Sequence, residues 1–599
     1  MRRSPARIFA LCAALAAMTG RVPGQPPDPG TYSDADHEVR ESRGHRAPMR
    51  DGVRPSAAGT GLAVRFDEDV RVPMTDGVTL AAKVFRPEVE GKKFPALMLL
   101  RYWQTGEEEA KVFTPHGYAC VLVDCRGRGR SGGRWDPYVN EPRDGADALK
   151  WIAQQSWCDG KIGTFGQSYN AFTQLMPAPL AGDHLKCLFP VEGQQSNFGH
   201  LYNEGVMQWN VVSTFGLYTT GPTGILPHKP LGDPHFRRLP LLDLVDEFPE
   251  AAPHVRRWFE HERLDDYWKS HGILGKYDKI RAPAYLVTGW YDNLVHENWK
   301  NFGGLRKHGG SEAARKGTKI RVGPTAHGGA WGQFEEHLRW YDHWLKGVDN
   351  GIQEEPPITL FIMGADRWRQ AHEWPLPQTR YTRLYLAGGK ANSTRGDGSL
   401  ATESPTNDAP RDRFVYDPAD PVYTLGGQIS TNPEVWGPRD RQSVQRREDV
   451  LVYTTAPLEE DTEVTGPVEV KLYAASDAVD TDFTATLTDV HPDGKAIHIC
   501  EGIRGARYRE SLEDPTPIEP GKVYEYTISL WETGQLFRAG HRIRLEISSS
   551  NFPRYARNQN TGLPLGTSDE IKKARQTIYR DAEHPSHLIL PIIPREGAR

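Results

Sequence analysis

The stretch Lys161-Ile-Gly-Thr-Phe-Gly-Gln-Ser-Tyr-Asn170 decides the fold of this chain. Its first five residues predict a buried strand, and the pattern from Tyr169 onward predicts a helix that begins at once. Ser168 therefore lies at a sharp turn from a strand into a helix, where Gly166 lets the two elements come close. The helix N-terminus favours negative charge that develops beside the serine. The stretch predicts a nucleophilic serine in a strained turn.

Two later strand ends supply the partners that such a serine needs. Gly289-Trp-Tyr-Asp292 follows an apolar strand, and Gly323-Pro-Thr-Ala-His327 follows the next one. In α/β-hydrolases the nucleophile, the acid and the base occur in the order Ser, Asp, His, each just after a strand. We therefore predict a catalytic triad of Ser168, Asp292 and His327. Asp292 would fix the imidazole tautomer, and His327 would take the proton from Ser168.

The strict pattern Gly-x-Ser-x-Gly occurs elsewhere, at residues 129–133 around Ser131. Ser131 lies several residues past its strand, and a Trp-Asp-Pro loop follows it in place of a helix. The missing helix favours a glycine-rich connection over a nucleophile. Because no Gly-Lys-Ser or Gly-Lys-Thr accompanies the arginines of this stretch, we interpret them as turn and ion-pair residues: Arg126, Arg128, Arg130 and Arg134.

Apolar strands and helices alternate on both sides of the serine turn. Continuous apolar runs such as residues 95–100 and 118–123 predict buried strands, and the amphipathic segment 144–155 predicts one of the helices between strands. Such strands with helical crossovers form a parallel sheet that is covered on both faces. We predict the fold class α/β, with an α/β-hydrolase domain built from residues 63–194 and 281–351.

The alternation is interrupted once and then ends. Residues 195–280 are rich in Trp, Tyr, Leu, Pro and Gly with short helical pieces, which predicts an inserted helical cap over the sheet. Residues 352–599 show short alternating runs separated by turn residues. That pattern predicts a C-terminal β jelly-roll domain.

The N-terminus has the pattern of an export signal. Three arginines precede an apolar run of eleven residues, 8–18, which is too short to span a bilayer as a mature helix. We predict a signal peptide at residues 1–24, a flexible leader at 25–62, and a secreted or periplasmic protein without a membrane span in its mature chain. An uncleaved anchor is the alternative.

Composition excludes several classes of protein. The chain of 599 residues holds 16 Trp, 23 Tyr and 20 Phe, too many aromatic residues for a disordered protein. Its net charge of −5 argues against a nucleic-acid partner. There is no Cys-x-x-Cys, and Pro585 interrupts the spacing of His584 and His587, so the sequence predicts neither a metal nor another cofactor.

These motifs together resemble a known family, that of cocaine esterase, the α-amino-acid ester hydrolases and the X-Pro dipeptidyl-peptidase-like hydrolases. The resemblance runs from about Val70 to Ile593 and implies the same fold and the same triad. It also implies that the backbone N–H of Tyr169 forms half of an oxyanion hole. The markers are Trp157-Cys-Asp-Gly160, Gly166-Gln-Ser-Tyr-Asn170, Gly289-Trp-Tyr-Asp292, Gly323-Pro-Thr-Ala-His327, Ala475-Ser-Asp-Ala-Val-Asp-Thr-Asp-Phe483, Ser548-Ser-Ser-Asn-Phe-Pro553 and Glu583-His-Pro-Ser-His587.

Two positions depart from the family pattern. Ala171 stands where the turn usually has a second glycine. The family also places a tyrosine, whose hydroxyl completes the oxyanion hole, three residues after an arginine at the end of an earlier strand. Here Gln104 has that position relative to Arg101, and Tyr102 lies two residues earlier. Since the strand sets the register, the sequence favours Gln104 over Tyr102 as the second donor.

The predicted function is that of a secreted serine hydrolase that cleaves carboxylic esters, and some amides, through an acyl-enzyme. Its partner would be a small-molecule ester or amide, and a homo-oligomer is left open. The alternatives are an α-amino-acid ester hydrolase, an acylase or an X-Pro dipeptidyl peptidase, and, from another class, a non-catalytic binding protein. Amine-recognising relatives have acidic residues where this chain has Leu294 and Val295, so we expect neutral acyl groups to be preferred.

Overall fold

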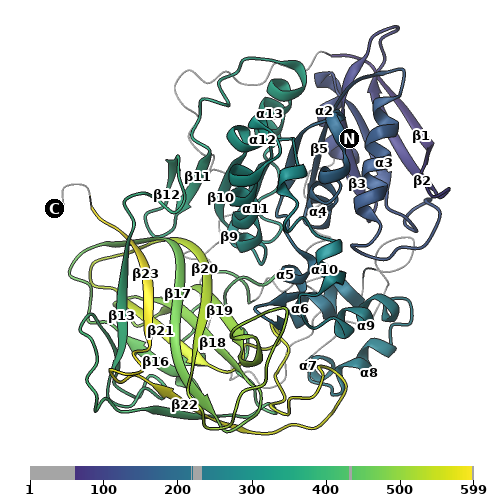
Figure 1. Cartoon of the computed structure of the whole chain (residues 1–599). Coiled ribbons are helices and arrows are strands. Elements are labelled where there is room, and N and C mark those ends of the chain that lie inside the picture. Colours follow the sequence, from purple (N-terminus) through teal and green to yellow (C-terminus); the bar gives the residue numbers. More distant parts are fainter. Residues whose placement is uncertain (1–60, 218, 220–232, 431–434, 596–599) are drawn as a thin grey trace.

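The computed structural model describes residues 61–217, 219, 233–430 and 435–595. The predicted signal peptide, and all but the last two residues of the predicted leader, lie outside the described residues. Figure 1 shows three parts: a sheet with helices on both sides, a helical group beneath it, and a domain of strands. Within the described part of the chain, no helix has the length and apolar character needed to cross a bilayer.

The first sheet is parallel at its centre and antiparallel at its edges. It contains the buried strands that the sequence predicts on both sides of Ser168. This confirms the predicted fold class. The strands lie in the order β1 (Val64–Pro73), β2 (Thr79–Pro87), β4 (Ala119–Asp124), β3 (Phe94–Arg101), β5 (Cys158–Gln167), β6 (Leu185–Val191), β9 (Tyr285–Tyr291), β10 (Lys319–Ala326), β11 (Ile358–Ile362) and β12 (Arg367–Ala371).

Helices cover the sheet on two faces, each with its own apolar core. Leu149, Phe172 and Val295 belong to the core under the first group of helices, and Phe113 and Trp340 to the core under the second. The first group is α3 (Glu141–Ala153), α4 (Tyr169–Leu175) and α11 (Val295–His308), and the second is α2 (Glu107–Phe113) and α13 (Phe334–Lys346). A further helix, α12 (Glu312–Gly317), packs on α11. Burial on both faces explains why the central strands are continuously apolar.

Two strands that follow residue 352 belong to the first sheet. Strand β11 pairs in parallel with β10, and β12 pairs with β11, so residues 358–371 extend that sheet. Helix α13 connects β10 to β11 and completes a β-α-β unit. Short alternating runs are common to sheet edges and to jelly rolls, so the sequence pattern does not tell which sheet these two strands join.

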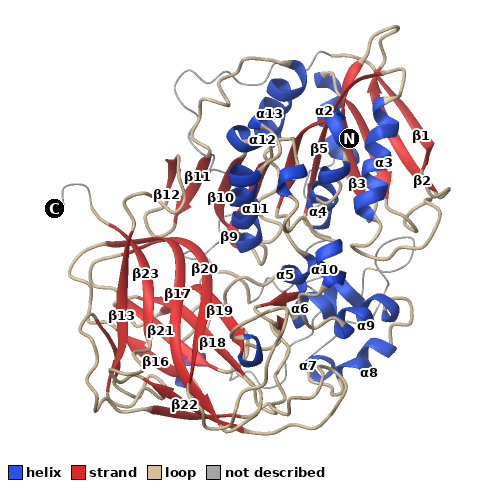
Figure 2. Ribbon diagram, viewed as in Figure 1, coloured by secondary structure: helices blue, strands red, loops and turns tan. Residues whose placement is uncertain are grey.

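The predicted cap follows β6 and consists of short helices (Figure 2). Trp209, Trp258 and Trp268 are fully buried and account for its aromatic composition. The described elements are α5 (Asn197–Leu201), β7 (Tyr202–Asn203), β8 (Val206–Met207), α6 (Trp209–Val211), a π-helical turn (Val212–Gly216), α7 (Asp233–Phe236), α8 (Leu241–Asp246), α9 (Ala252–Glu260) and α10 (Asp266–Ser270).

The C-terminal domain is built of antiparallel strands around a separate apolar core. Its longest strands, β17 (Thr462–Ser476) and β20 (Tyr524–Phe537), pair with each other. The other strands are β13 (Arg380–Gly388), β14 (Gly398–Ala401), β15 (Asp412–Tyr416), β16 (Leu451–Thr454), β18 (Asp482–Val490), β19 (Ala496–Gly505), β21 (Arg542–Ser548), β22 (Ala574–Tyr579) and β23 (His587–Ile593). This is the β domain that the sequence predicts.

The β domain is tied to the end of strand β9. Tyr291 donates its hydroxyl to the carbonyl oxygen of His498 at 3.0 Å. Trp290 donates its indole N–H to the carbonyl oxygen of Phe361 at 2.7 Å, and Gln428 donates to the carbonyl oxygen of Trp290 at 3.3 Å. The strand end that carries Asp292 is thus anchored by both domains.

Candidate active site

Ser168 occupies the turn between β5 and α4. Its backbone has φ 59° and ψ −123°, a conformation that costs a non-glycine residue about 1–3 kcal/mol. At Gly166 φ is +141°, and an added Cβ would lie 2.7 Å from the carbonyl oxygen of Asn170. Only glycine therefore lets the strand and helix approach this closely. Ala171, at the place where the family has a second glycine, is fully buried in α4.

The structure brings Ser168, His327 and Asp292 together. Nε2 of His327 lies 2.9 Å from Oγ of Ser168, and Nδ1 of His327 lies 2.8 Å from Oδ1 of Asp292. Strands β9 and β10 are parallel neighbours, so their carboxyl ends, which carry Asp292 and His327, meet at one edge of the sheet. The chain of contacts from hydroxyl to imidazole to carboxylate has the geometry of an activated nucleophile.

Two groups besides the imidazole hold the carboxylate of Asp292. The hydroxyl of Thr288 donates to Oδ2 of Asp292 at 2.7 Å, and the backbone N–H of Leu294 donates to Oδ1 at 3.1 Å. The carboxylate is fully buried. Its orientation toward His327 is therefore set by groups of its own strand and of the turn that follows.

A second carboxylate, which the sequence analysis missed, also faces His327. Glu192 follows β6 directly, is fully buried, and has Oε2 3.5 Å from Nδ1 of His327. The backbone N–H groups of Gly328 and Ala330 donate to its two oxygens at 2.8 and 3.3 Å, and Gln167 donates at 2.8 Å. The backbone of Glu192 has φ 57°, so the residue is held in a strained conformation.

The two carboxylates act on one imidazole. Burial by itself lowers the pKa of His327, but the charges of Glu192 and then Asp292 raise this pKa to about 9. Burial raises the pKa of Glu192 to about 7, against the lowering effect of the charge on His327. The site therefore stabilises the protonated imidazole, which is the form that results when His327 takes a proton from Ser168.

The side chains of Gln104 and Tyr102, the two candidates for the second oxyanion donor, have different surroundings. Both ends of the Gln104 amide have partners: its nitrogen donates to Asp124 at 3.1 Å, and its oxygen accepts from Arg101 at 3.0 Å. The ring of Tyr102 packs on the ring of Tyr169, with centroids 4.9 Å apart. Tyr169, whose backbone N–H is the other candidate donor, is anchored by a 2.5 Å hydrogen bond from its hydroxyl to Glu141.

Aromatic side chains from the sheet and the cap surround these residues. The ring of Phe215 packs against Tyr102, Tyr169 and His200. Burial lowers the pKa of His200 to about 4, and the nearby charge of His327 acts in the same direction. His200 is therefore neutral at pH 7, and the described part of the cap places this imidazole and the Phe215 ring beside Tyr169 and Tyr102.

The remaining residues singled out by sequence have structural surroundings. The hydroxyl of Ser131 donates to the carbonyl oxygen of Asp124 at 2.7 Å and accepts from the N–H of Ala81 at 2.8 Å, as expected of a connection between elements. Arg126 pairs with Asp76 and Asp144 at 2.7 and 2.6 Å. Leu294 and Val295 are buried and uncharged.

Comparisons with known proteins agree with this architecture. A family model described as X-Pro dipeptidyl-peptidase (S15 family) matches residues 76–329, and one described as the X-Pro dipeptidyl-peptidase C-terminal non-catalytic domain matches residues 350–589. The cocaine esterase of Rhodococcus sp. (strain MB1 Bresler) is 36% identical over 577 residues, which cover 88% of this chain and 98% of the relative.

Two solved structures share the fold across almost the whole chain. An aminopeptidase from a marine sediment archaeon, Thaumarchaeota archaeon, has a TM-score of 0.78 at 22% identity, covering 94% of this chain and 100% of that one. An α-amino-acid ester hydrolase has a TM-score of 0.76 at 22% identity with the same coverage. From the family models and the cocaine esterase match, this chain belongs to the S15 family of serine hydrolases, which contains cocaine esterase and the X-Pro dipeptidyl-peptidases.

Proposed function

We propose that this protein is a serine esterase that hydrolyses carboxylic esters, and some amides, through an acyl-enzyme on Ser168. The observation that carries the proposal is the unbroken contact chain from Oγ of Ser168 through the imidazole of His327 to Asp292, built on a strained turn. Membership of the S15 family supports the same reaction class.

In this reaction the oxygen of Ser168 attacks the ester carbonyl while Nε2 of His327 takes its proton. The protonated imidazole then donates that proton to the leaving alcohol, which leaves the acyl group on Ser168. A water molecule, deprotonated by His327, releases the acid and restores the serine. Asp292 keeps the proton-bearing Nδ1 oriented in both half-reactions.

We assign the oxyanion hole to the backbone N–H of Tyr169 and the hydroxyl of Tyr102. The assignment of Tyr102 in place of Gln104 is supported by the contact between the two tyrosine rings and by the engagement of the Gln104 amide with Asp124 and Arg101. These contacts favour Tyr102, whereas the register of the preceding strand favoured Gln104. Two donors are needed because the tetrahedral intermediate carries a full negative charge.

The acyl pocket is proposed to prefer neutral acyl groups over α-amino acyl groups. Leu294 and Val295 place no carboxylate where amine-recognising relatives have one, and a buried ammonium without a partner is costly. Glu297, the next acidic residue along the chain, pairs with Lys300 at 3.0 Å and accepts the N–H of Ser196. The protein is further proposed to be secreted or periplasmic, on the export pattern of residues 1–24 alone.

A fluorophosphonate probe tests the proposal directly, because it reacts only with an activated serine. We expect the purified full chain to be labelled at Ser168, Ser168→Ala to lose all labelling, and Ser131→Ala to keep it. Ser131→Ala is the matched control because it removes the serine of the alternative Gly-x-Ser-x-Gly motif. Labelling that survives Ser168→Ala would overturn the assignment.

A further inference from the structure

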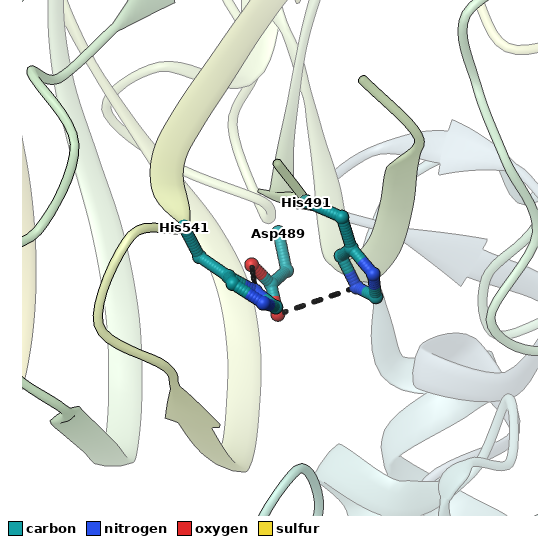
Figure 3. A group of neighbouring side chains, drawn as sticks. All are labelled: Asp489, His491 and His541. Carbon is teal, nitrogen blue, oxygen red and sulfur yellow. Dashed lines mark hydrogen bonds and ion pairs between the residues drawn. The ribbon is translucent and has the colours of Figure 1, made fainter. Parts of the chain in front are cut away.

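A cavity of about 700 Å³ lies between the hydrolase sheet and the β domain, and three ionisable side chains gather on its wall. They are Asp489 at the end of β18, His491 in the turn after it, and His541 in the turn before β21. Figure 3 shows both imidazoles directed at the carboxylate of Asp489. Ser168 is not among the residues that line this cavity.

The nitrogen and oxygen atoms of these three side chains are close enough together to bind one metal ion. Nδ1 of His541 lies 2.8 Å from Oδ1 of Asp489, and Nε2 of His491 lies 3.8 Å from Oδ2. The two imidazole centroids are 4.4 Å apart. In a tetrahedral zinc site with bonds of about 2.0–2.1 Å, neighbouring ligand atoms are about 3.3–3.4 Å apart. One donor atom from each of the three residues lies within 4.8 Å of the other two, so modest side-chain shifts would bring the set to that spacing.

The charge balance at Asp489 also favours a cation. Asp489 is 3% exposed, and burial raises its pKa, which measures the cost of keeping the carboxylate charged there. The arginines of the cavity wall have carboxylate partners of their own: Arg321 lies 3.4 Å from Glu336, and Arg538 lies 3.3 Å from Asp461.

The other groups that face Asp489 are two imidazoles and one amide. Gln535 fixes the orientation of the carboxylate by donating to Oδ2 at 3.3 Å, but it brings no charge. A bound cation would place a positive charge beside the buried carboxylate.

We propose that Asp489, His491 and His541 form a binding site for a divalent transition-metal ion of the zinc class. Two imidazole nitrogens and one carboxylate oxygen suit zinc, cobalt or nickel, whereas calcium and magnesium prefer all-oxygen sites. Three protein ligands leave a fourth coordination position, and it opens into the cavity, where water or a small anion completes the coordination. The sequence pattern concealed this site because His541 is 50 residues away from His491.

The test uses the full chain, stripped with a chelator and dialysed, and titrated with Zn²⁺ by calorimetry. We expect one equivalent to bind. Since loss of a group outside the ligand set already costs about 10- to 100-fold in metal affinity, His491→Ala and His541→Ala should each weaken binding at least tenfold. Co²⁺ should give the visible absorption of a nitrogen-ligated, low-coordinate ion, and Ca²⁺ and Mg²⁺ should not compete.

His584→Ala is the matched control. His584 also pairs with an aspartate, Asp581, at 3.1 Å in the same domain, but among the described residues this pair belongs to no group of three possible metal ligands. The control should leave the Zn²⁺ titration unchanged. A wild-type protein that binds no stoichiometric Zn²⁺ in the micromolar range would overturn the proposal without any variant. The proposal would also be overturned if both variants, His491→Ala and His541→Ala, bound Zn²⁺ as tightly as the wild type. This result counts only if both metal-free variants melt at the wild-type temperature, which shows that they are folded.

Discussion

Replacement of Glu192 by glutamine should shift the pH dependence of the esterase toward acid. Glutamine keeps the volume and an acceptor for Gly328, but it removes the negative charge 3.5 Å from Nδ1 of His327. That charge is the largest factor that raises the pKa of His327 to about 9. The variant should therefore hold a neutral, competent imidazole at a lower pH than the wild type.

The size of the shift follows from the distance. Two unit charges 3.5 Å apart interact by about 4.7 kcal/mol at an effective dielectric constant of about 20, or about 3.5 pKa units. This is a ceiling, because burial raises the pKa of Glu192 to about 7 and the carboxylate is charged only part of the time near neutrality. We expect a fall of about one to two units in the apparent pKa.

The assay is kcat/KM for a fast neutral ester, measured across pH, since this parameter reports ionisation of the free enzyme. The wild type should gain activity with rising pH through an apparent pKa above the usual value for histidine. Glu192→Gln should reach its plateau at a lower pH, with the plateau reduced less than about tenfold because Asp292 still orients the imidazole.

Glu297→Gln provides the control. Glu297 is an equally buried glutamate of the same domain, but it pairs with Lys300 and not with His327. Its replacement should leave the apparent pKa in place. If Glu192→Gln keeps the wild-type apparent pKa, or raises it, the reasoning about the second carboxylate is wrong.

Three further outcomes are expected. Tyr102→Phe should lower kcat by about 10²- to 10³-fold, as loss of an oxyanion donor does, and Gln104→Ala by less than about tenfold; the reverse pattern would return the role to Gln104. Esters of phenylacetate should show higher kcat/KM than matched esters of phenylglycine, because Leu294 and Val295 offer no carboxylate, and a preference for phenylglycine would contradict this. Mass spectrometry of protein from a secreting host should find an N-terminus between about residues 17 and 30, whereas an intact Met1 in membranes would identify an anchor.

The serine turn could be predicted because its requirements are local. Gly166, Ser168 and the helix that follows lie within a few residues, and the strand ends before Asp292 and His327 obey a rule of chain order. Glu192 obeys the same geometric rule, since it follows β6, which lies between the strands of Ser168 and Asp292. The position of this glutamate directly after the strand 185–191 could therefore have indicated that its side chain lies near Ser168 and Asp292.

Other features depend on contacts that no local pattern contains. The proposed role of Tyr102 in place of Gln104 rests on the hydrogen bond from the Gln104 amide to Asp124, which lies 20 residues away in the chain. Strand β11 joins the first sheet through its register with β10, although its sequence matches a jelly-roll strand equally well. Asp489 and His541 come together because β18 pairs with β21, a strand far from it in the sequence.

The ties between strand β9 and the β domain constrain how this enzyme can be engineered. Trp290 donates to Phe361 of the edge strand β11, and Tyr291 donates to His498 of the β domain, so the strand end before Asp292 is braced by residues that follow residue 351. A shortened protein ending near residue 351 would lose both acceptors together with the edge strands β11 and β12. Engineered variants should therefore keep the two domains together. New termini or insertions belong in exposed turns outside the interface between them.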